Sequence, residues 1–335
     1  MSIQNAWTKL ESSAQEPVAG LLVLRLCPES NLDIFAAVDP QSGRRLLVLK
    51  SNAPPVQRFE ELPEGVGFAL RFIETLGDTD GPFSLRFELT NASYADVFDV
   101  VANDVIENIV RLNEPTAAFD AFAGRIAEWQ AFLNSLPSTG LSDQHQQGLF
   151  AELKFLKDIL LKTCSAESAV AAWAGPKALA KDFHFAKMAF EVKATTTKQP
   201  TRFRISSEVQ LECGENSRLF VFGCIFERVL SGGSSLPELV LEVRESLRPN
   251  GLASTRFAQL LFQRGYIDLD SKRYDARFKM RAQHFFEVKA DFPRIVGSEL
   301  RRGVGDVHYS ILLSDCLRFE VSETEVRQLL KETKA

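Results

Sequence analysis

The apolar residues of this chain recur with two different periods in two successive regions. Up to about residue 112 they follow the alternation of strands, over residues 21–24, 33–38, 45–50, 67–73 and 83–89. Residues 39–43 (Asp-Pro-Gln-Ser-Gly) join two of these segments and are typical of a hairpin loop. Residues 94–112 then place five aliphatic side chains at helical spacing. We therefore expect an N-terminal, strand-rich α+β domain over residues 1–114, in which the sequence shows no chemistry.

From residue 115 onward, amphipathic helices alternate with apolar strands. Helices are expected over residues 115–136, from about residue 142, over 236–247, over 255–266 and from residue 323. Strands are expected as a short pair over 182–195, then over 219–226, 278–290 and 307–313. This order of elements predicts an α/β fold with a mixed sheet over residues 115–335, including a C-terminal extension.

Charge is distributed unevenly between the two regions. Residues 1–114 carry 9 Lys and Arg against 17 Asp and Glu, a balance of −8, whereas the remaining 221 residues carry 30 against 27, a balance of +3. Residues 172–204 contain 7 basic and 2 acidic residues. Such a stretch either forms an ordinary solvated face or meets phosphate groups. The acidic N-terminal region is the less suitable one for direct contact with DNA.

Several classes of protein are excluded by what the sequence lacks. No apolar run reaches the roughly 18–20 residues that span a bilayer. No G-x-S-x-G, G-x-x-x-x-G-K-[ST] or complete G-x-G-x-x-G motif occurs, and the four His and five Cys show no zinc-ligand spacing. Residues 1–13 lack the basic and apolar regions of a secretory signal, and the scattered Cys indicate reduced thiols. We therefore expect a cytoplasmic protein that is not embedded in a membrane.

A carboxylate nine residues before an acid-x-Lys triplet is the most informative pattern in the chain. On a strand, Glu191 and Lys193 share one face. If Ala186 and Lys187 form a two-residue hairpin loop, Asp182 lies opposite Glu191, with Cβ atoms roughly 4.5–5.5 Å apart. Two carboxylates this close repel by about 3–4 kcal/mol at an effective dielectric near 20. A divalent cation between them would turn repulsion into binding, and oxygen ligands favour Mg²⁺ or Mn²⁺.

The triplet alone is not diagnostic, because five acid-x-Lys triplets occur in the sequence. The near-copy over residues 287–290 follows Asp275 by twelve residues, but no acid-bearing helix precedes it, and we interpret it as an ordinary strand. Glu152, in contrast, precedes the first triplet on a predicted helix, at the margin of that helix's buried stripe. Glu152 either forms a salt bridge to a nearby Lys or joins the same metal site. Spacing leaves both interpretations open.

A Glu on a helix, followed by an Asp and an acid-x-Lys triplet on consecutive strands, resembles the PD-(D/E)XK nuclease superfamily. More narrowly, the chain resembles a bacterial family of PD-(D/E)XK motif proteins, which are often encoded in restriction or phage-defence clusters. The residues that carry this resemblance extend over most of the chain: 148–153, 173–176, 182–183, 191–194, 205–211, 292–295 and 303–310. The plain departure is Lys181, which stands where the superfamily has a Pro before the Asp.

The resemblance implies a restriction-endonuclease-like core, a mixed central sheet flanked by helices, with a metal-dependent site. The catalytic side chains that it implies are Glu152, Asp182, Glu191, Lys193 and Gln210. Asp182 and Glu191, with the Val192 carbonyl, would hold Mg²⁺ or Mn²⁺, and Glu152 would complete the metal site from its helix. Lys193 would neutralise charge and position the attacking water. Gln210 would orient a phosphate or a metal-bound water.

The implied function is that of a metal-dependent DNA endonuclease within a restriction or phage-defence system. The basic run would contact the DNA backbone with little sequence discrimination, through Lys177, Lys181, Lys198, Arg202 and Arg204. Methyltransferase or helicase/ATPase subunits are the expected partners, and a homodimer is left open. Two alternatives remain: a non-catalytic DNA-binding or scaffold subunit with a nuclease fold, and a nuclease that acts on RNA.

Overall fold

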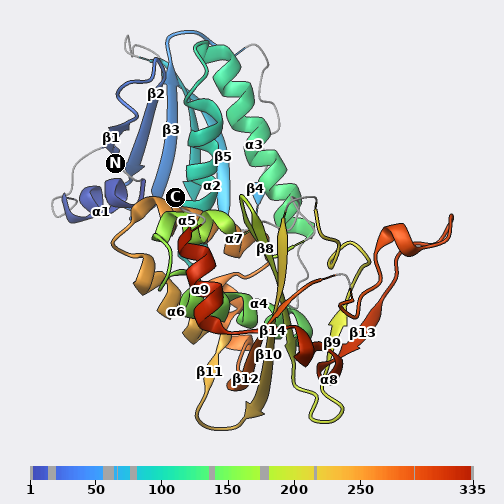
Figure 1. Ribbon diagram of the computed structural model, residues 1–335. Coiled ribbons are helices and arrows are strands. Elements are labelled where there is room, and N and C mark those ends of the chain that lie inside the picture. Colours follow the sequence, from blue (N-terminus) through green and yellow to red (C-terminus); the bar gives the residue numbers. More distant parts are fainter. Residues whose placement is uncertain are drawn as a thin grey trace. The chain divides into compact units, whose positions relative to one another are not determined.

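The protein is described by a computed structural model (Figure 1), which covers residues 3–13, 20–55, 64–65, 67–75, 81–135, 140–173, 181–214, 217–289 and 291–332. The chain divides into two compact units, residues 1–138 and 139–335. Each unit contains its own sheet and its own helices, so each is described by itself. The mixed α/β character predicted from the sequence is confirmed.

The first unit is built around an antiparallel sheet with the strand order β1-β2-β3-β6-β5-β4. The bounds are β1 Leu22–Leu26, β2 Asp33–Val38, β3 Arg45–Ser51, β4 Glu64–Gly65, β5 Phe68–Glu74 and β6 Phe83–Leu89. The predicted hairpin is confirmed, because β2 and β3 pair with Val38 opposite Arg45. The helices of this unit are α1 Ile3–Ser13, η1 Ala92–Tyr94, α2 Ala95–Ile109 and α3 Pro115–Ser135.

Helix α3 belongs to the first unit, so the boundary expected at residue 114 differs from the division that the structure shows. Arg125 of α3 places two guanidinium nitrogens on the carboxylate of Asp104 in α2, at 2.5 and 2.9 Å. Trp129 Nε1 donates to the same carboxylate at 2.7 Å. These contacts tie α3 to α2. Sequence periodicity marks where a helix begins, but it does not say against which neighbour the helix packs.

The second unit contains a mixed sheet with the order β11-β12-β10-β8-β7, to which β14 adds beside β12. Strands β10 and β8 are parallel, and the other pairs are antiparallel. The bounds are β7 Phe183–Phe185, β8 Met188–Thr195, β10 Arg218–Val229, β11 Ser234–Ser235, β12 Arg277–Glu287 and β14 Glu320–Val321. A separate antiparallel pair is formed by β9 Arg202–Ile205 and β13 Tyr309–Leu312.

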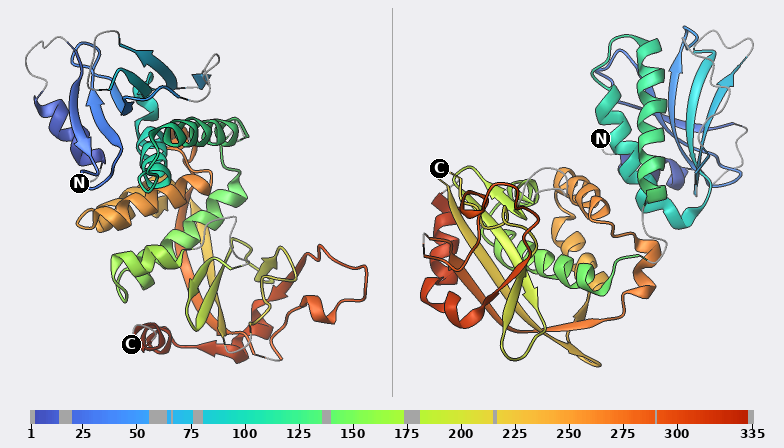
Figure 2. Two further views of the ribbon diagram at one scale, coloured as in Figure 1. Left: turned by 90° about the horizontal axis from the view of Figure 1, so that it is seen from above. Right: turned by 90° about the vertical axis from the view of Figure 1, so that its right-hand side faces the viewer.

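Helices cover the sheet of the second unit, as Figure 2 shows. The helices and helical turns described in this unit are α4 Asp143–Phe155, η2 Leu156–Leu160, α5 Ala166–Ala172, α6 Leu236–Leu247, α7 Gly251–Gln263, η3 Asp268–Arg273, η4 Gly297–Glu299, α8 Leu313–Cys316, η5 Leu317–Phe319 and α9 Glu323–Glu332. One core cluster joins α4–α7 and α9 to Phe190 and Phe222 of the sheet. A second cluster joins Phe203 of β9 and Ile311 of β13 to side chains on the other face of the sheet, such as Ala189 of β8 and Val221 of β10. Strand β8 is therefore buried on both faces.

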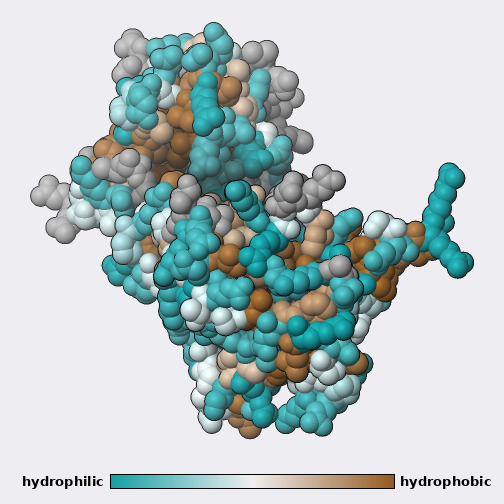
Figure 3. All heavy atoms as spheres, in the orientation of Figure 1, coloured by the Kyte–Doolittle hydropathy of each residue, from teal (hydrophilic) through white to brown (hydrophobic). Residues whose placement is uncertain are grey.

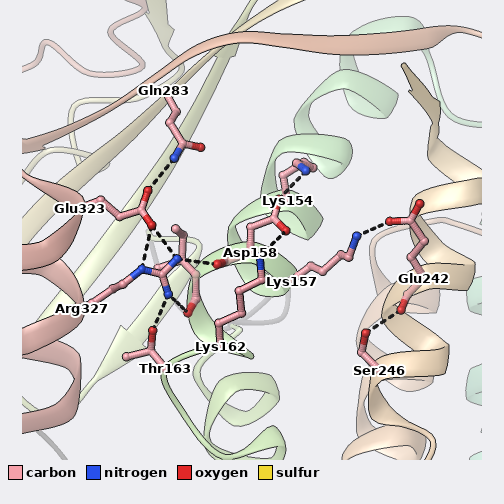
Figure 4. Close-up of polar contacts among 11 residues, drawn as sticks. Lys154, Lys157, Asp158, Lys162, Thr163, Glu242, Ser246, Gln283, Glu323 and Arg327 are labelled. Atoms are coloured by element: carbon pink, nitrogen blue, oxygen red, sulfur yellow. Dashed lines mark hydrogen bonds and ion pairs between the residues drawn. The ribbon is translucent and has the colours of Figure 1, made fainter. Parts of the chain in front are cut away.

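A π-helical turn, η2, continues α4 and is held by a side chain from α9 (Figure 4). The guanidinium of Arg327 donates to the carbonyls of Asp158 at 2.7 Å and Ile159 at 3.2 Å, and to Thr163 Oγ1 at 2.8 Å. Glu323 accepts from Arg327 Nε at 2.8 Å and so orients the guanidinium. A π turn leaves carbonyls without their usual α-helical donors, and Arg327 supplies donors for two of them.

Replacing Arg327 with Ala is expected to lower the free energy of unfolding by about 1–3 kcal/mol, because it leaves three partly buried acceptors without these donors. The measurement is urea denaturation followed by circular dichroism. Lys331→Ala is the matched control, because Lys331 is an exposed cation on the same helix and should change stability by less than about 0.5 kcal/mol. Equal losses in the two variants would contradict the role given to Arg327.

Candidate active site

The β7–β8 hairpin brings the first two carboxylates of the predicted site together. Its register is the one expected from the sequence: Phe183 pairs with Phe190 and Phe185 with Met188, around a turn at Ala186 and Lys187. Asp182 immediately precedes β7. Strand β7 is short, so β8 continues beyond its paired segment.

The side chain of Asp182 takes the place of a missing strand partner. The amide of Val192, on β8 just past the end of β7, donates to Asp182 Oδ2 at 2.8 Å. This bond fixes one oxygen of Asp182 against the exposed edge of β8. It holds the carboxylate next to Glu191, the residue before Val192.

Glu191 and Lys193 lie on one face of β8 and form a buried ion pair. Lys193 Nζ is 2.7 Å from Glu191 Oε1, and the two residues are 9% and 1% exposed. Lys193 Nζ also donates to Gln210 Oε1 at 2.9 Å. The same oxygen accepts from the amide of Ser206 at 2.8 Å, which holds Gln210 within the turn that follows β9. The predicted Glu191, Lys193 and Gln210 are thus in direct contact.

Glu152 approaches this group from α4, and its partner is an arginine. Arg264, at the C-terminal end of α7, contacts both oxygens of Glu152, at 3.2 and 3.0 Å. Trp173 Nε1 donates to Glu152 Oε2 at 2.7 Å. Arg264 also lies 3.7 Å from Asp182 Oδ1, and so connects the two carboxylates. The salt bridge left open by the sequence exists, but with Arg264 instead of a Lys.

Sequence reasoning missed Arg264, which is 112 residues from Glu152 along the chain. It follows the apolar residues of α7 as a single Arg, and no motif or spacing marks it. Trp173 belongs to a segment of the family resemblance, but no pattern in the sequence connects its indole with Glu152. Helices α5 and α7 pack against each other and share one core cluster with α4, and this packing brings both side chains to Glu152.

Two of the three carboxyl groups hold their protons unusually strongly. Burial, and after it the negative charge of Asp182, raises the pKa of Glu191 to about 8, against the opposing effect of Lys193. Burial and the charge of Asp182 likewise raise the pKa of Glu152 to about 8, although Arg264 and Trp173 act in the other direction. Besides burial, the charge of Asp182 raises the pKa of both Glu152 and Glu191, so the three carboxyl groups interact with one another. An added cation would relieve their repulsion.

These pKa shifts predict that the metal-free protein loses stability as pH rises. In the unfolded chain Glu152 and Glu191 lose their protons near the ordinary pKa of 4.5, whereas the folded chain keeps them until about pH 8. Between these values the folded state binds more protons, so the free energy of unfolding falls with increasing pH. The slope is at most about 1.4 kcal/mol per pH unit for each carboxyl. Urea denaturation in EDTA at pH 5, 6, 7 and 8 measures this slope. The difference in the free energy of unfolding between a Glu152→Gln, Glu191→Gln double variant and the native chain should increase over this range in favour of the variant. A constant difference would contradict the assignment.

The donor atoms of the site suit a divalent cation held by two carboxylates. Glu191 Oε2 is buried and has no hydrogen-bond partner in the described part of the chain. Asp182 supplies further carboxylate oxygen beside it, and hard oxygen donors are the ligands of Mg²⁺. Within the described residues, no group of three or more His, Cys, Asp or Glu side chains is arranged to hold a metal ion. Trp173 and Arg264 contact both oxygens of Glu152, and its place in a three-carboxylate metal site stays a prediction.

The predicted DNA-contacting residues have different surroundings. Lys198, Arg202 and Arg204 are exposed. Lys181 donates to the carbonyl of Val209 at 2.6 Å, and burial lowers the pKa of its ammonium group. Lys177 lies outside the described residues. Three of the five predicted cations are therefore found on the surface.

The second acid-x-Lys triplet has a different environment, in agreement with its interpretation as an ordinary strand end. Glu287 is the last residue of β12 and accepts from Arg218 at 2.7 Å, while Lys289 lies 2.9 Å from its other oxygen. Burial alone would raise the pKa of Glu287, but the hydrogen bonds from Arg218 and Lys289 outweigh burial and lower it. Lys289 is largely exposed. Glu287 thus contacts two cations, whereas Glu191 contacts one, Lys193, and burial together with the charges of Asp182 and Glu152 raises its pKa.

A helix-borne Glu, an Asp before a hairpin and a buried Glu-x-Lys on the following strand form the arrangement that the sequence resemblance to the PD-(D/E)XK class implied. The chain belongs to the DUF4420 family, described as a putative PD-(D/E)XK family member, whose model matches residues 3–314. The resemblance noted in the sequence is thereby confirmed. No curated protein and no solved structure matches the chain. Among the described residues, no helix is long and apolar enough to cross a membrane.

Proposed function

We propose that this protein is a metal-dependent endonuclease that hydrolyses DNA phosphodiester bonds. The observation that carries the proposal is the buried Glu191–Lys193 pair beside Asp182, with one oxygen of Glu191 unpaired. Asp182 and Glu191 would hold Mg²⁺ or Mn²⁺, and the family resemblance adds the Val192 carbonyl. When bound, the ion would lower the pKa of a water and stabilise negative charge on the phosphate oxygens.

The chain's own side chains supply orientation and positive charge. An ammonium group has three N–H donors, and Lys193 uses two of them, on Glu191 Oε1 and Gln210 Oε1. The third is available for a phosphate oxygen or an attacking water. Because Gln210 is itself fixed by the amide of Ser206, the ammonium group is oriented before substrate arrives. Preorganised charge of this kind favours the transition state over the ground state.

Arg264 and Glu152 would position Asp182 instead of touching the substrate. Arg264 is held by the two oxygens of Glu152 and extends toward Asp182 Oδ1. The amide of Val192 fixes the other oxygen of Asp182. A ligand carboxylate that is oriented on both sides loses little freedom when it binds an ion.

One observation favours a second function, that of a non-catalytic DNA-binding or scaffold subunit. Arg264 lies beside Glu152 and Asp182 and already supplies positive charge where an ion would otherwise supply it. A site neutralised in this way needs no metal for stability. The restriction or phage-defence context, the methyltransferase or helicase/ATPase partners and the cytoplasmic location rest on the family resemblance and the sequence, and are proposed on that ground.

Plasmid nicking tests the proposed activity. The native chain is expected to nick supercoiled DNA with Mg²⁺ or Mn²⁺ and to be inactive with EDTA, and Asp182→Ala should abolish nicking because it removes one of the two ligand carboxylates. Cleavage of single-stranded RNA and of structured RNA under the same conditions decides whether the substrate is DNA or RNA. Nicking by Asp182→Ala at the native rate would reject the site. Inactivity of the native chain, also with the neighbouring subunits present, would favour the scaffold function.

A further inference from the structure

The β9–β13 pair continues into a segment that extends away from the sheet of the second unit. This segment, residues 292–308, leads through η4 into β13 and is drawn in orange-red (Figure 1; Figure 2, left). We call β9, β13 and residues 292–308 the arginine arm. We propose that the arginine arm binds the phosphate backbone of duplex DNA beside the catalytic site. The inference rests on the proposed function in taking DNA as the ligand, but not on hydrolysis.

The base of the arginine arm is fixed next to Lys193. In β9, Phe203 and Ile205 are buried. The ring of Phe203 packs on Gly223 of β10 so closely that a Cβ there would lie 2.7 Å from it, and Gly223 is the register partner of Lys193. The hydroxyl of Tyr309 accepts from the amide of Ile295 at 3.0 Å and closes the base.

The outer surface of the arginine arm carries cations that have no acidic partner. Arg202 and Arg204 alternate with the buried residues of β9, so they share the face turned to solvent. Arg301 and Arg302 are exposed in the loop, and Lys198 is exposed just before β9. Among the described residues, none of these five side chains forms an ion pair within 4.0 Å. Figure 3 shows that the outer end of the arm is hydrophilic.

The acidic residues in and beside the arm offset only part of this charge. Glu208 accepts from the amide of Val307 at 3.1 Å, and Glu299 accepts from the amide of Val296 at 3.3 Å. Both carboxylates are turned to the arm's own backbone, and Asp306 is the exposed acid of the loop. The arm itself, residues 202–205 and 292–312, carries five Arg against two acidic residues, and Lys198 lies just before it, so this surface attracts a polyanion.

The arm fits duplex DNA better than a single strand. Proteins that bind single strands use exposed aromatic rings on which the bases stack. The Phe and Tyr rings of the arm are committed to the core: Phe203 and Phe292 are buried, and Tyr309, partly buried, packs against the same core cluster. Exposed Arg side chains on β9 and in residues 292–308 instead suit the phosphate backbone of a duplex.

Salt-dependent binding tests the arm separately from catalysis. Fluorescence anisotropy with a 30-base-pair duplex in EDTA, between about 50 and 200 mM NaCl, gives the slope of log Kd against log[NaCl]. Each lost phosphate contact reduces the slope by about 0.9, so the Arg301→Ala, Arg302→Ala double variant should reduce it by about 1.8. Arg202→Ala with Arg204→Ala should act similarly. The control, Lys272→Ala with Lys279→Ala, removes two exposed cations outside the arm and should keep the native slope.

Three outcomes would overturn the arm proposal: a native slope in both arm variants, no salt-dependent binding of duplex by the native chain, or tighter binding of a single strand of the same sequence. Each is distinguishable from failure of the proposed function. Nicking by the native chain with unchanged binding in the arm variants would reject the arm and keep the nuclease. Loss of binding in the arm variants together with an inactive native chain would support the arm on a non-catalytic DNA-binding subunit.

Discussion

Replacing Lys193 with Ala is expected to reduce the rate of plasmid nicking by about 10²–10³-fold, the effect of removing one preorganised group that stabilises transition-state charge. Lys193 is the cation in contact with Glu191 in the described site, and Gln210 aims it. Its loss removes charge compensation and leaves Glu191 Oε1 without its donor. The expected loss is mainly in kcat, because binding of a long DNA is shared among many phosphate contacts.

Lys289→Ala is the matched control for this variant. Lys289 occupies the same position in the second triplet and also pairs with its Glu, at 2.9 Å, but it is largely exposed, and that Glu keeps Arg218 as a second cation. The rate of nicking by Lys289→Ala should remain within about twofold of native. Equal losses in both variants would contradict the assignment, because they would show that the buried environment of Lys193 does not distinguish it from Lys289.

The hairpin that carries the site was predictable because two local rules fix it. Side chains alternate along a strand, and a two-residue loop at Ala186 and Lys187 sets the register of the pair. Glu152 was likewise placed correctly at the margin of the buried face of its helix. These inferences needed only neighbours in the sequence. The restriction-endonuclease-like description of the core remains a proposal.

The contacts that decide what Glu152 does were not predictable, because they come from distant elements. Arg264 reaches it from α7 and Trp173 from the end of α5, and only packing brings these segments together. The start of α7 was also placed too late. Asn250 caps the helix by accepting from the amide of Ala253, but Asn-Gly in a sequence is typical of a turn. The division near residue 138 differs from the boundary expected at residue 114 for a similar reason, since the ion pair between Arg125 and Asp104 is a tertiary contact.

The environment of the two triplets predicts opposite effects for the same substitution. Glu191→Gln should raise the free energy of unfolding of the metal-free protein by about 1–3 kcal/mol at pH 8, because it removes a buried charge that faces two other carboxylates. The amide keeps an oxygen that accepts from Lys193. Glu287→Gln should lower stability instead, because that carboxylate is stabilised by Arg218 and Lys289. Urea denaturation in EDTA measures both.

The gain from Glu191→Gln should depend on pH and should be accompanied by loss of function. At pH 6 the native Glu191 is mostly protonated, since its pKa is about 8, so the difference between the variant and native protein should shrink. Mg²⁺ should raise the melting temperature of the native protein more at pH 8 than at pH 6, because a ligand carboxylate must lose its proton to bind. Glu191→Gln should abolish both the rise in melting temperature with Mg²⁺ and the nicking activity. Glu191 would then lower the stability of the metal-free protein and yet be required for ion binding. Such a residue is kept for function at a cost in stability. A destabilised Glu191→Gln variant at pH 8 would instead mean that the charge on Glu191 serves its ion pair with Lys193 and that the two neighbouring carboxylates do not oppose it.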